Sequence, residues 1–271
     1  MNLKQKKVII TGSASGIGKA LAEQFIGQGS IVVLADKNER ELNAVSQVLG
    51  CSYYVCDVGN EESIRRLVEK ATHRLGHIDL FCSNAGVFHK DDVSRPGLEE
   101  KKWMDSWEVN VMSHVYAARY VLPQMMDRQS GYFLQIISAA ALLSQVGASA
   151  YSATKSAALS FAESLAISYG TKGIKVSAVC PQYVATPMLG FKGKRQEIRN
   201  ENLISSEEAA NCIIQGVNDE KFLIVTDSKV MHLFEKKCQN YERWISGMQR
   251  LNNKVVDENK GLDLEQIYKL L

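Results

Sequence analysis

A glycine-rich turn at residues 11–18 constrains the fold of this chain more than any other stretch of its sequence. It contains Gly12, Gly16 and Gly18, and it joins the β-branched run at residues 8–10 to a helix expected over residues 17–28. At such a turn the backbone N–H groups of a helix N-terminus can approach a diphosphate, and the helix dipole favours its negative charge. The glycine spacing GxxxGxG differs from the usual dinucleotide fingerprint GxGxxG, and by itself the turn also fits a tight strand-to-helix connection.

The next strand strengthens the dinucleotide interpretation. Residues 31–35 form an apolar run that ends at Asp36, 18 residues after Gly18. A carboxylate at this position accepts hydrogen bonds from the hydroxyls of an adenosine ribose. Because it would repel a 2′-phosphate, the sequence predicts NAD rather than NADP, although Lys37 is able to reach a phosphate. The alternative role for Asp36 is to cap a helix that begins near Glu39.

Strands and helices alternate along the rest of the chain. Helices are expected over residues 39–49, 61–75, 101–127 and 206–217 and around Tyr151, and strands over residues 52–56, 78–82, 132–137, 174–179 and 222–225. This alternation predicts one Rossmann-type α/β domain, a doubly wound parallel sheet of about seven strands with helices on both faces. We expect the domain to span residues 1–252, with a substrate lid at about 183–205 and a tail at 253–271.

Tyr151 and Lys155 form the candidate chemical site. Residues four apart lie on one face of a helix, so the phenol and the ammonium point the same way. The ammonium favours the phenolate and lowers the pKa of Tyr151, which makes the phenol a usable acid or base at neutral pH. Ser138 follows the apolar run at residues 132–137, where a hydroxyl reaches a ligand above the sheet. Without a cofactor site, the same pair would be an ordinary surface Tyr and Lys.

Composition argues against several other classes of protein. The net charge of +2 gives no reason to expect a nucleic-acid surface. The six cysteines include no CxxC pair and indicate reduced thiols, so we expect no metal site and a reducing, cytoplasmic location. The apolar run at residues 8–10 is too short to span a membrane, so no integral membrane segment is expected.

A stripe of apolar residues marks the C-terminal part of the chain. It predicts one amphipathic helix that packs on the body of the protein or on a partner subunit. The alternatives are that the helix lies on a membrane or covers the substrate, and the mixed charge of its polar face argues against the membrane. The stripe consists of Phe234, Cys238, Tyr241, Ile245, Met248 and Leu251.

Together these motifs resemble those of the short-chain dehydrogenases/reductases. The matching pieces run in the family's order over about residues 5–190: Thr11-Gly12-xxx-Gly16-Ile17-Gly18, Asp36, Asp57-Val58, Asn84-Ala85-Gly86, Asn110, Ser138, Tyr151-xxx-Lys155 and Pro181-xxxx-Thr186. Gln182 stands where the family often has glycine, and Ser83 where asparagine is common. The resemblance implies an NAD-dependent oxidoreductase that moves a hydride between nicotinamide and a secondary alcohol or ketone.

The resemblance also implies a role for each matching residue. Tyr151 would exchange the substrate proton, and Ser138 would hydrogen-bond the substrate oxygen. Lys155 would bind the nicotinamide ribose, and Asn110 would hold a water that links Lys155 to solvent. The residues implied to bind the cofactor are Gly12, Ser15, Gly16, Ile17, Gly18, Asp36, Asp57, Val58, Asn84, Ala85, Gly86, Tyr151, Lys155, Pro181, Val184 and Thr186.

The expected substrate pocket is moderately apolar, which suits a hydrophobic alcohol such as a steroid, lipid or retinoid. Its residues are Ser138, Ala140, Leu142, Gln145, Gln182, Tyr183, Met188, Leu189 and Phe191. The basic run at residues 192–199 equally suits a 3-oxoacyl substrate carried by acyl-carrier protein or CoA, unless its charges are only solvated. A catalytically silent dinucleotide-binding regulator and a membrane-bound enzyme are the other hypotheses. The family resemblance further suggests a homo-tetramer or homo-dimer.

Overall fold

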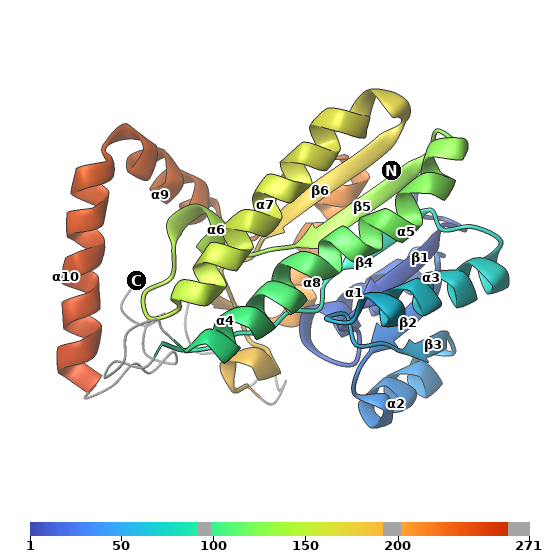
Figure 1. Ribbon diagram of the computed structural model, residues 1–271, viewed down its shortest axis with the longest axis horizontal. Helices are drawn as coiled ribbons and strands as arrows, with labels where there is room; N and C mark the ends of the chain where they lie inside the picture. The colour runs from blue at the N-terminus through green and yellow to red at the C-terminus, as the bar shows by residue number, and fades with distance from the viewer. Residues whose placement is uncertain (92–98, 192–201, 260–271) are drawn as a thin grey trace.

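The computed structural model describes residues 1–91, 99–191 and 202–259. A seven-stranded parallel sheet runs through it in the order β3-β2-β1-β4-β5-β6-β9 (Figure 1). The strands are β1 (Lys7–Thr11), β2 (Ile31–Asp36), β3 (Ser52–Val55), β4 (Leu80–Ser83), β5 (Gly131–Ile136), β6 (Ile174–Cys180) and β9 (Leu223–Val225). The chain builds outward from β1 to β3 and then returns to place β4 on the other side of β1. This reversal confirms the doubly wound sheet and creates a crevice at the carboxyl ends of the strands.

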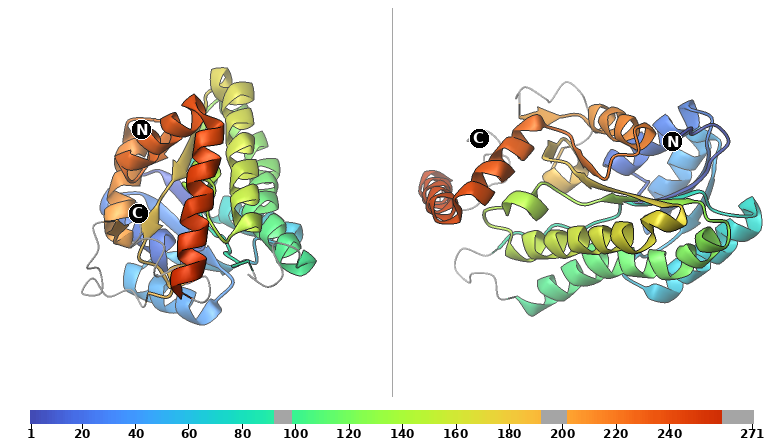
Figure 2. Two further views of the ribbon diagram at one scale, coloured as in Figure 1. Left: turned by 90° about the vertical axis from the view of Figure 1, so that its left-hand side faces the viewer. Right: turned by 90° about the horizontal axis from the view of Figure 1, so that it is seen from above.

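Helices cover both faces of the sheet, as the view from above in Figure 2 shows. Val8 and Ile10 of β1 belong to one core and Ile9 to the other, because successive side chains of a strand point to opposite faces. The first core is covered by α1 (Gly16–Gly27), α2 (Glu39–Leu49) and α8 (Ser206–Asn218). The second is covered by α3 (Glu61–Leu75), α5 (Ser113–Asp127) and α7 (Ser149–Tyr169).

Capping residues set several helix boundaries. α2 begins after Asn38, whose side chain accepts a hydrogen bond from the Glu41 N–H, and it ends at Gly50 in the left-handed region. α8 begins after Ser205, which forms a reciprocal capping box with Glu208. These local signals explain why the predicted bounds of α2 and α3 agree with the observed ones.

The long helix predicted over residues 101–127 is divided into three parts. α4 spans Glu100–Trp107, a π-helical turn spans Glu108–Met112, and α5 follows from Ser113. A π-turn widens the helix by one residue, and such turns occur often at functional sites. Asn110, one of the predicted site residues, lies at the centre of this turn.

The C-terminal stripe forms two helices, α9 (Ser228–Gln239) and α10 (Tyr241–Asn259), so the prediction of one continuous helix is wrong. Asn240 between them is extended, with φ −153° and ψ 94°. Its side chain accepts a hydrogen bond from the Arg243 N–H at 2.8 Å, so one residue ends α9 and caps the start of α10. Figures 1 and 2 show α10 standing at one end of the molecule.

Residue 253, the predicted start of the tail, lies inside α10. The helix continues through Asn259, and Val255 is fully buried against Phe88, Tyr183, Leu189 and Leu251. Residues 253–259 are therefore part of this helix, and its C-terminal half contacts the body of the protein. Residues 260–271 of the predicted tail lie outside the described residues.

The two ends of the segment predicted as a lid pair with each other in a small two-stranded sheet. β7 (Tyr183–Val184) pairs in parallel with β8 (Leu203–Ile204), and a 3₁₀ turn spans Pro187–Leu189. Residues 192–201 of this segment, with their basic run, lie outside the described residues. The remaining short elements are α6 (Ala140–Leu143) and the 3₁₀ turn Gly170–Lys172. In the described part of the chain, no helix combines the length and hydrophobicity needed to cross a bilayer.

Candidate active site

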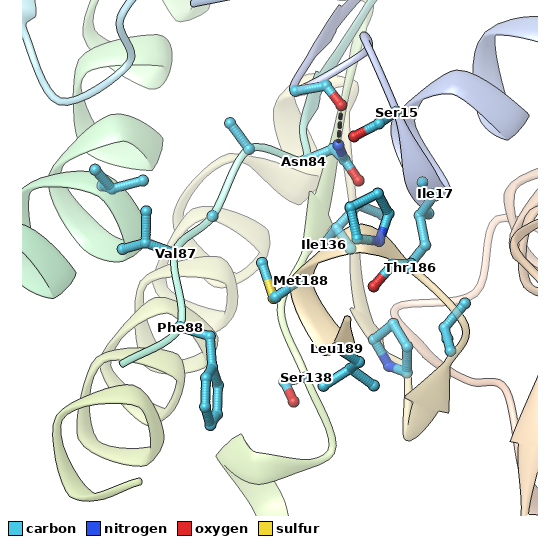
Figure 3. A pocket seen from close by; sticks show the side chains of 18 of the residues that line it. Ser15, Ile17, Asn84, Val87, Phe88, Ile136, Ser138, Thr186, Met188 and Leu189 are labelled. Atoms are coloured by element: carbon cyan, nitrogen blue, oxygen red, sulfur yellow. Dashed lines mark hydrogen bonds between the residues drawn. The ribbon is translucent and has the colours of Figure 1, made fainter. Parts of the chain in front are cut away.

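A cleft of about 280 Å³ opens at the carboxyl ends of the strands. Figure 3 shows Ser15, Ile17 and Asn84 toward one end of it, and Phe88, Ser138 and Leu189 toward the other. The structure brings most of the predicted site residues into its lining. They are Gly12, Ser15, Gly16, Ile17, Asp36, Asp57, Val58, Asn84, Ala85, Gly86, Ser138, Gln145, Tyr151, Lys155, Pro181, Gln182, Tyr183, Val184, Thr186, Met188 and Leu189.

Several predicted residues do not line this cleft: Gly18, Asn110, Ala140, Leu142 and Phe191. Gly18 lies behind the cleft lining, in contact with the glycine-rich turn, because a Cβ there would lie 2.2 Å from the carbonyl oxygen of Gly12. It therefore permits the close packing of α1 on the turn. Ala140 lies in α6 and lines a second cavity beside Ser138.

The glycine-rich turn has the shape of an anion cradle. Gly12 and Gly16 have φ of +65° and +53°, which favour glycine, and a Cβ on Gly12 would lie 2.8 Å from the Cα of Ala85. Ser15 precedes α1 without capping it through its side chain, and the first turn of α1 holds no acidic residue. The N-terminal end of α1 is thus available to an anion, so these residues fit the diphosphate of a dinucleotide.

Asn84 and Thr11 fix the wall of the cleft between β1 and β4. The Asn84 side-chain amide donates hydrogen bonds to the carbonyl oxygens of Thr11 at 2.9 Å and Gly12 at 3.1 Å, and a dashed line from Asn84 marks one such bond in Figure 3. In return, Thr11 Oγ1 accepts from the backbone N–H groups of Asn84 and Ala85. Asn84 therefore holds the glycine-rich turn in place from the neighbouring strand.

Asp36 lies at the end of β2, within reach of the turn. Its carboxylate accepts hydrogen bonds from the N–H of Ala14 at 3.1 Å and from the N–H of Asn38 at 3.0 Å. The cap of α2 is Asn38, so the alternative role of Asp36 as that helix cap is wrong. Asp36 is partly exposed and lines the cleft, where it fits the ribose of an adenosine.

Tyr151 and Ser138 meet at the other end of the cleft. Burial raises the pKa of Tyr151, and a hydrogen bond with Ser138 lowers it by a smaller amount. Lys155 Nζ lies 5.6 Å from the centroid of the Tyr151 ring. The expectation that Lys155 lowers the pKa of Tyr151 is therefore not met in this structure, because loss of water around the phenol outweighs the other effects.

Lys155 itself is buried, with 3% of its surface exposed. Its ammonium donates to the carbonyl oxygen of Ile136 at 3.3 Å. Burial lowers its pKa to about 8, so the side chain is mostly protonated at pH 7. A modest change in its surroundings is enough to shift its charge near neutral pH.

Asn110 clamps the loop after β4 to α7. Its side-chain oxygen accepts from the Val87 N–H at 2.9 Å, and its amide donates to the Val87 carbonyl at 3.0 Å and to Thr154 Oγ1 at 3.2 Å. These bonds position the loop that carries Phe88. The role that the resemblance implies for Asn110, holding a water that links Lys155 to solvent, stays a prediction.

Sequence reasoning missed part of the lining. The missed residues are Cys56, Val87, Phe88, Val109, Ile136, Ile137 and Pro187. Lys37, which the sequence analysis named as able to reach a phosphate, also lines the cleft. Phe88 is the most consequential, since its ring packs edge-on against the ring of Tyr151 at a centroid distance of 4.9 Å. A signal was present, because Val87 and Phe88 directly follow Asn84-Ala85-Gly86 at the end of a strand.

Comparison with known proteins identifies the family. A model of the short chain dehydrogenase family matches residues 6–197. The 1-deoxy-11-beta-hydroxypentalenate dehydrogenase of Streptomyces exfoliatus is 30% identical over 236 residues, which cover 84% of this chain and 85% of that protein. The chain therefore belongs to the short-chain dehydrogenase/reductase family. Its members are oxidoreductases that bind a nicotinamide dinucleotide.

Other relatives are also named as dehydrogenases or reductases. The 3-oxoacyl-[acyl-carrier-protein] reductase FabG of Haemophilus influenzae is 30% identical over 69% of this chain and 77% of its own length. The meso-2,3-butanediol dehydrogenase of Serratia marcescens is 30% identical over 74% of this chain and 79% of its own. A short-chain dehydrogenase/reductase from Burkholderia phymatum, solved in complex with NAD, superposes with a TM-score of 0.79 at 24% identity over 89% of this chain and 96% of that one, which supports the fold.

Proposed function

We propose that this protein is an NAD-dependent oxidoreductase that transfers a hydride between nicotinamide and a secondary alcohol or ketone, with Tyr151 as the acid/base. The observation that carries the proposal is the position of Tyr151 and Ser138 in the same cleft as the glycine-rich turn. The names of the relatives support the reaction class, since they refer to hydroxylated or oxo compounds.

Each polar residue at the reacting end has a separate task. When bound, the nicotinamide accepts or supplies the hydride. Ser138 donates a hydrogen bond that holds the substrate oxygen near the phenol of Tyr151. During oxidation Tyr151 takes the alcohol proton, and during reduction it gives the proton to the carbonyl oxygen. Lys155, mostly protonated at neutral pH, offsets the charge of a phenolate that burial alone disfavours.

The cofactor is held by residues at the other end of the cleft. The turn with Gly12 and Gly16 receives the diphosphate, and Asp36 accepts hydrogen bonds from the adenosine ribose. Asp57 and Val58 flank the adenine, and Asp57 is itself fixed by accepting a hydrogen bond from the Gly59 N–H at 3.1 Å. The negative charge of Asp36 underlies the preference for NAD over NADP.

The substrate is an apolar alcohol or ketone. Around Ser138 and Tyr151 the cleft is lined by Phe88, Gln145, Tyr183, Met188 and Leu189, none of which is charged. A 3-oxoacyl thioester is the second candidate, supported by the FabG relative. The basic residues on which that candidate also depended lie outside the described residues.

Replacing Tyr151 by Phe tests the proposal. The variant keeps the ring that packs on Phe88 and loses only the phenolic hydroxyl, so we expect NADH binding within threefold of wild type and turnover reduced by about a thousandfold or more. Turnover is measured as NADH absorbance with a panel of secondary alcohols and ketones. Full activity in Tyr151→Phe would overturn the assigned chemistry. NADH binding without turnover of any substrate by the wild type would favour the silent regulator.

A further inference from the structure

A second cavity of about 80 Å³ lies next to the reaction cleft, between α6, α9 and α10. Five residues line both spaces and connect them: Ser138, Gln145, Pro181, Gln182 and Tyr183. The second cavity, here called the side chamber, therefore begins where the reacting oxygen of a substrate would lie.

The side chamber has a polar side and an apolar side. Ser138, Gln145, Gln182 and Tyr183 face both cavities, and the Tyr183 hydroxyl donates to Gln145 Oε1 at 3.2 Å across their junction. The far wall is formed by Leu143, Leu233, Trp244, Met248 and Leu251, and none of the described residues that line the chamber is charged. Water is poorly held by such a wall because it offers few hydrogen-bond partners.

The helices that form the far wall are tied to the body of the protein. Lys237 of α9 donates through its ammonium to the carbonyl oxygen of Leu142 in α6 at 2.6 Å. On α10, the spacing of Trp244, Met248, Leu251 and Val255 places them along one face of the helix. This face encloses the chamber, and its far end packs through Val255 on Phe88, Tyr183 and Leu189 at the edge of the cleft.

We propose that the side chamber binds the apolar tail of an elongated secondary alcohol or ketone whose oxygen lies at Ser138 and Tyr151. The proposal rests on the proposed function and narrows its substrate to a molecule with an unbranched or slender hydrocarbon tail. Gln145 and Tyr183 form the threshold that the tail crosses. An apolar space that opens beside the reacting groups is suited to this part of a substrate, because burying each methylene there favours binding.

The first test is a series of secondary alcohols from 2-butanol to 2-decanol, with NAD as the oxidant. We expect kcat/KM to rise about fourfold for each added methylene until the chamber is filled. Met248→Trp adds bulk to the far wall, so we expect the ratio of kcat/KM for 2-decanol to that for 2-butanol to fall at least tenfold. Ile245→Trp is the matched control, since Ile245 is 47% exposed on the same helix, and we expect its ratio to equal that of wild type.

The second test does not require turnover. In a Trp103→Phe/Trp107→Phe variant the remaining tryptophan is Trp244, which lines the chamber. We expect 2-decanone to shift its fluorescence emission and 2-butanone at equal concentration to leave it unchanged.

The two tests separate failure of the tail site from failure of the proposed function. Turnover that is independent of chain length, or equal ratios in Met248→Trp and Ile245→Trp, would overturn the tail site and leave the reaction intact. If no alcohol or ketone is turned over with either cofactor, the proposed function fails. In that case a shift of Trp244 emission with 2-decanone but not with 2-butanone would still support a site for an apolar chain. The absence of any shift would overturn that site.

Discussion

The ring of Phe88 packs against the ring of Tyr151 with a centroid distance of 4.9 Å and an interplanar angle of 60°. Phe88 also touches Val255 of α10 within a small apolar cluster. The side chain expected to handle the proton is therefore held by a loop residue, and that loop residue is in turn held by the C-terminal helix. This connection gives a distant part of the chain a direct path to the reacting group.

Removing the ring of Phe88 is expected to slow turnover and leave cofactor affinity intact. An edge-on aromatic pair contributes about 0.5–1.5 kcal/mol, so Phe88→Ala should lower kcat up to about tenfold as Tyr151 gains rotational freedom. Phe88→Tyr keeps the ring and should retain kcat. The measurements are steady-state kinetics and NADH titration. An NADH affinity that falls as much as kcat would show that Phe88 acts through the cofactor instead.

Two glycines of α1 should respond in opposite ways to alanine. A Cβ at Gly18 would lie 2.2 Å from the carbonyl oxygen of Gly12, whereas a Cβ at Gly27 meets nothing within 4 Å. Gly18→Ala must displace the turn, so we expect a loss of several kcal/mol of unfolding free energy and of NADH binding. Gly27→Ala should be neutral or stabilise the protein by up to about 1 kcal/mol. Urea denaturation and NADH titration check both, and equal effects would contradict this reading of the turn.

Asp36 should determine the choice between NAD and NADP. We expect wild type to prefer NAD, and Asp36→Ala to shift the ratio of kcat/KM values toward NADP by at least tenfold, since it removes a carboxylate that repels the 2′-phosphate. Glu39→Ala makes the same change of charge at an exposed position nearby and should leave the ratio unchanged. A wild-type preference for NADP would refute the electrostatic argument.

His114 should make the stability of the protein sensitive to acid. It is fully buried in α5, neither ring nitrogen has a hydrogen-bond partner in the described structure, and burial with the nearby charge of Lys155 lowers its pKa to about 3. Below pH 6.5 the unfolded chain binds a proton at this residue that the folded chain does not. The free energy of unfolding should therefore decrease as the pH is lowered from 6.5 to about 3, by up to roughly 1.4 kcal/mol per pH unit.

Variants at two histidines check this prediction. His114→Gln removes the titrating group, so the loss of stability between pH 7 and pH 5 should be smaller than in wild type. His73→Gln removes an exposed histidine of α3 and should leave the pH dependence unchanged. The measurement is urea denaturation at several pH values, and an identical pH slope in His114→Gln and wild type would refute the role of burial.

The features that short-range sequence patterns specify were predictable. β-Branched runs located the strands, and Asn38, Gly50 and Asn60 set helix ends through local hydrogen bonds and backbone conformation. The order of strands and helices then predicted the doubly wound sheet. Gly12, Asp36 and Ser138 lie at or just after the carboxyl ends of their strands, so they meet at one edge of this sheet. These interactions involve residues close in sequence, so their signals can be recognised along the chain.

The remaining features depended on residues far apart in sequence. Asn240 divides the C-terminal stripe, yet the apolar spacing continues across it, so periodicity alone did not reveal the break. The contact of Val255 with Phe88 joins residues that are 167 positions apart in the chain.

The direction of the Tyr151 pKa shift likewise separates what nearby residues determine from what distant residues determine. The spacing of Tyr151 and Lys155 placed both on one helix, and this much the sequence determined by itself. Only the tertiary structure decided that burial raises the pKa of Tyr151, because desolvation depends on everything packed around the phenol. Local geometry is encoded within a few residues, whereas burial is a property of the whole fold.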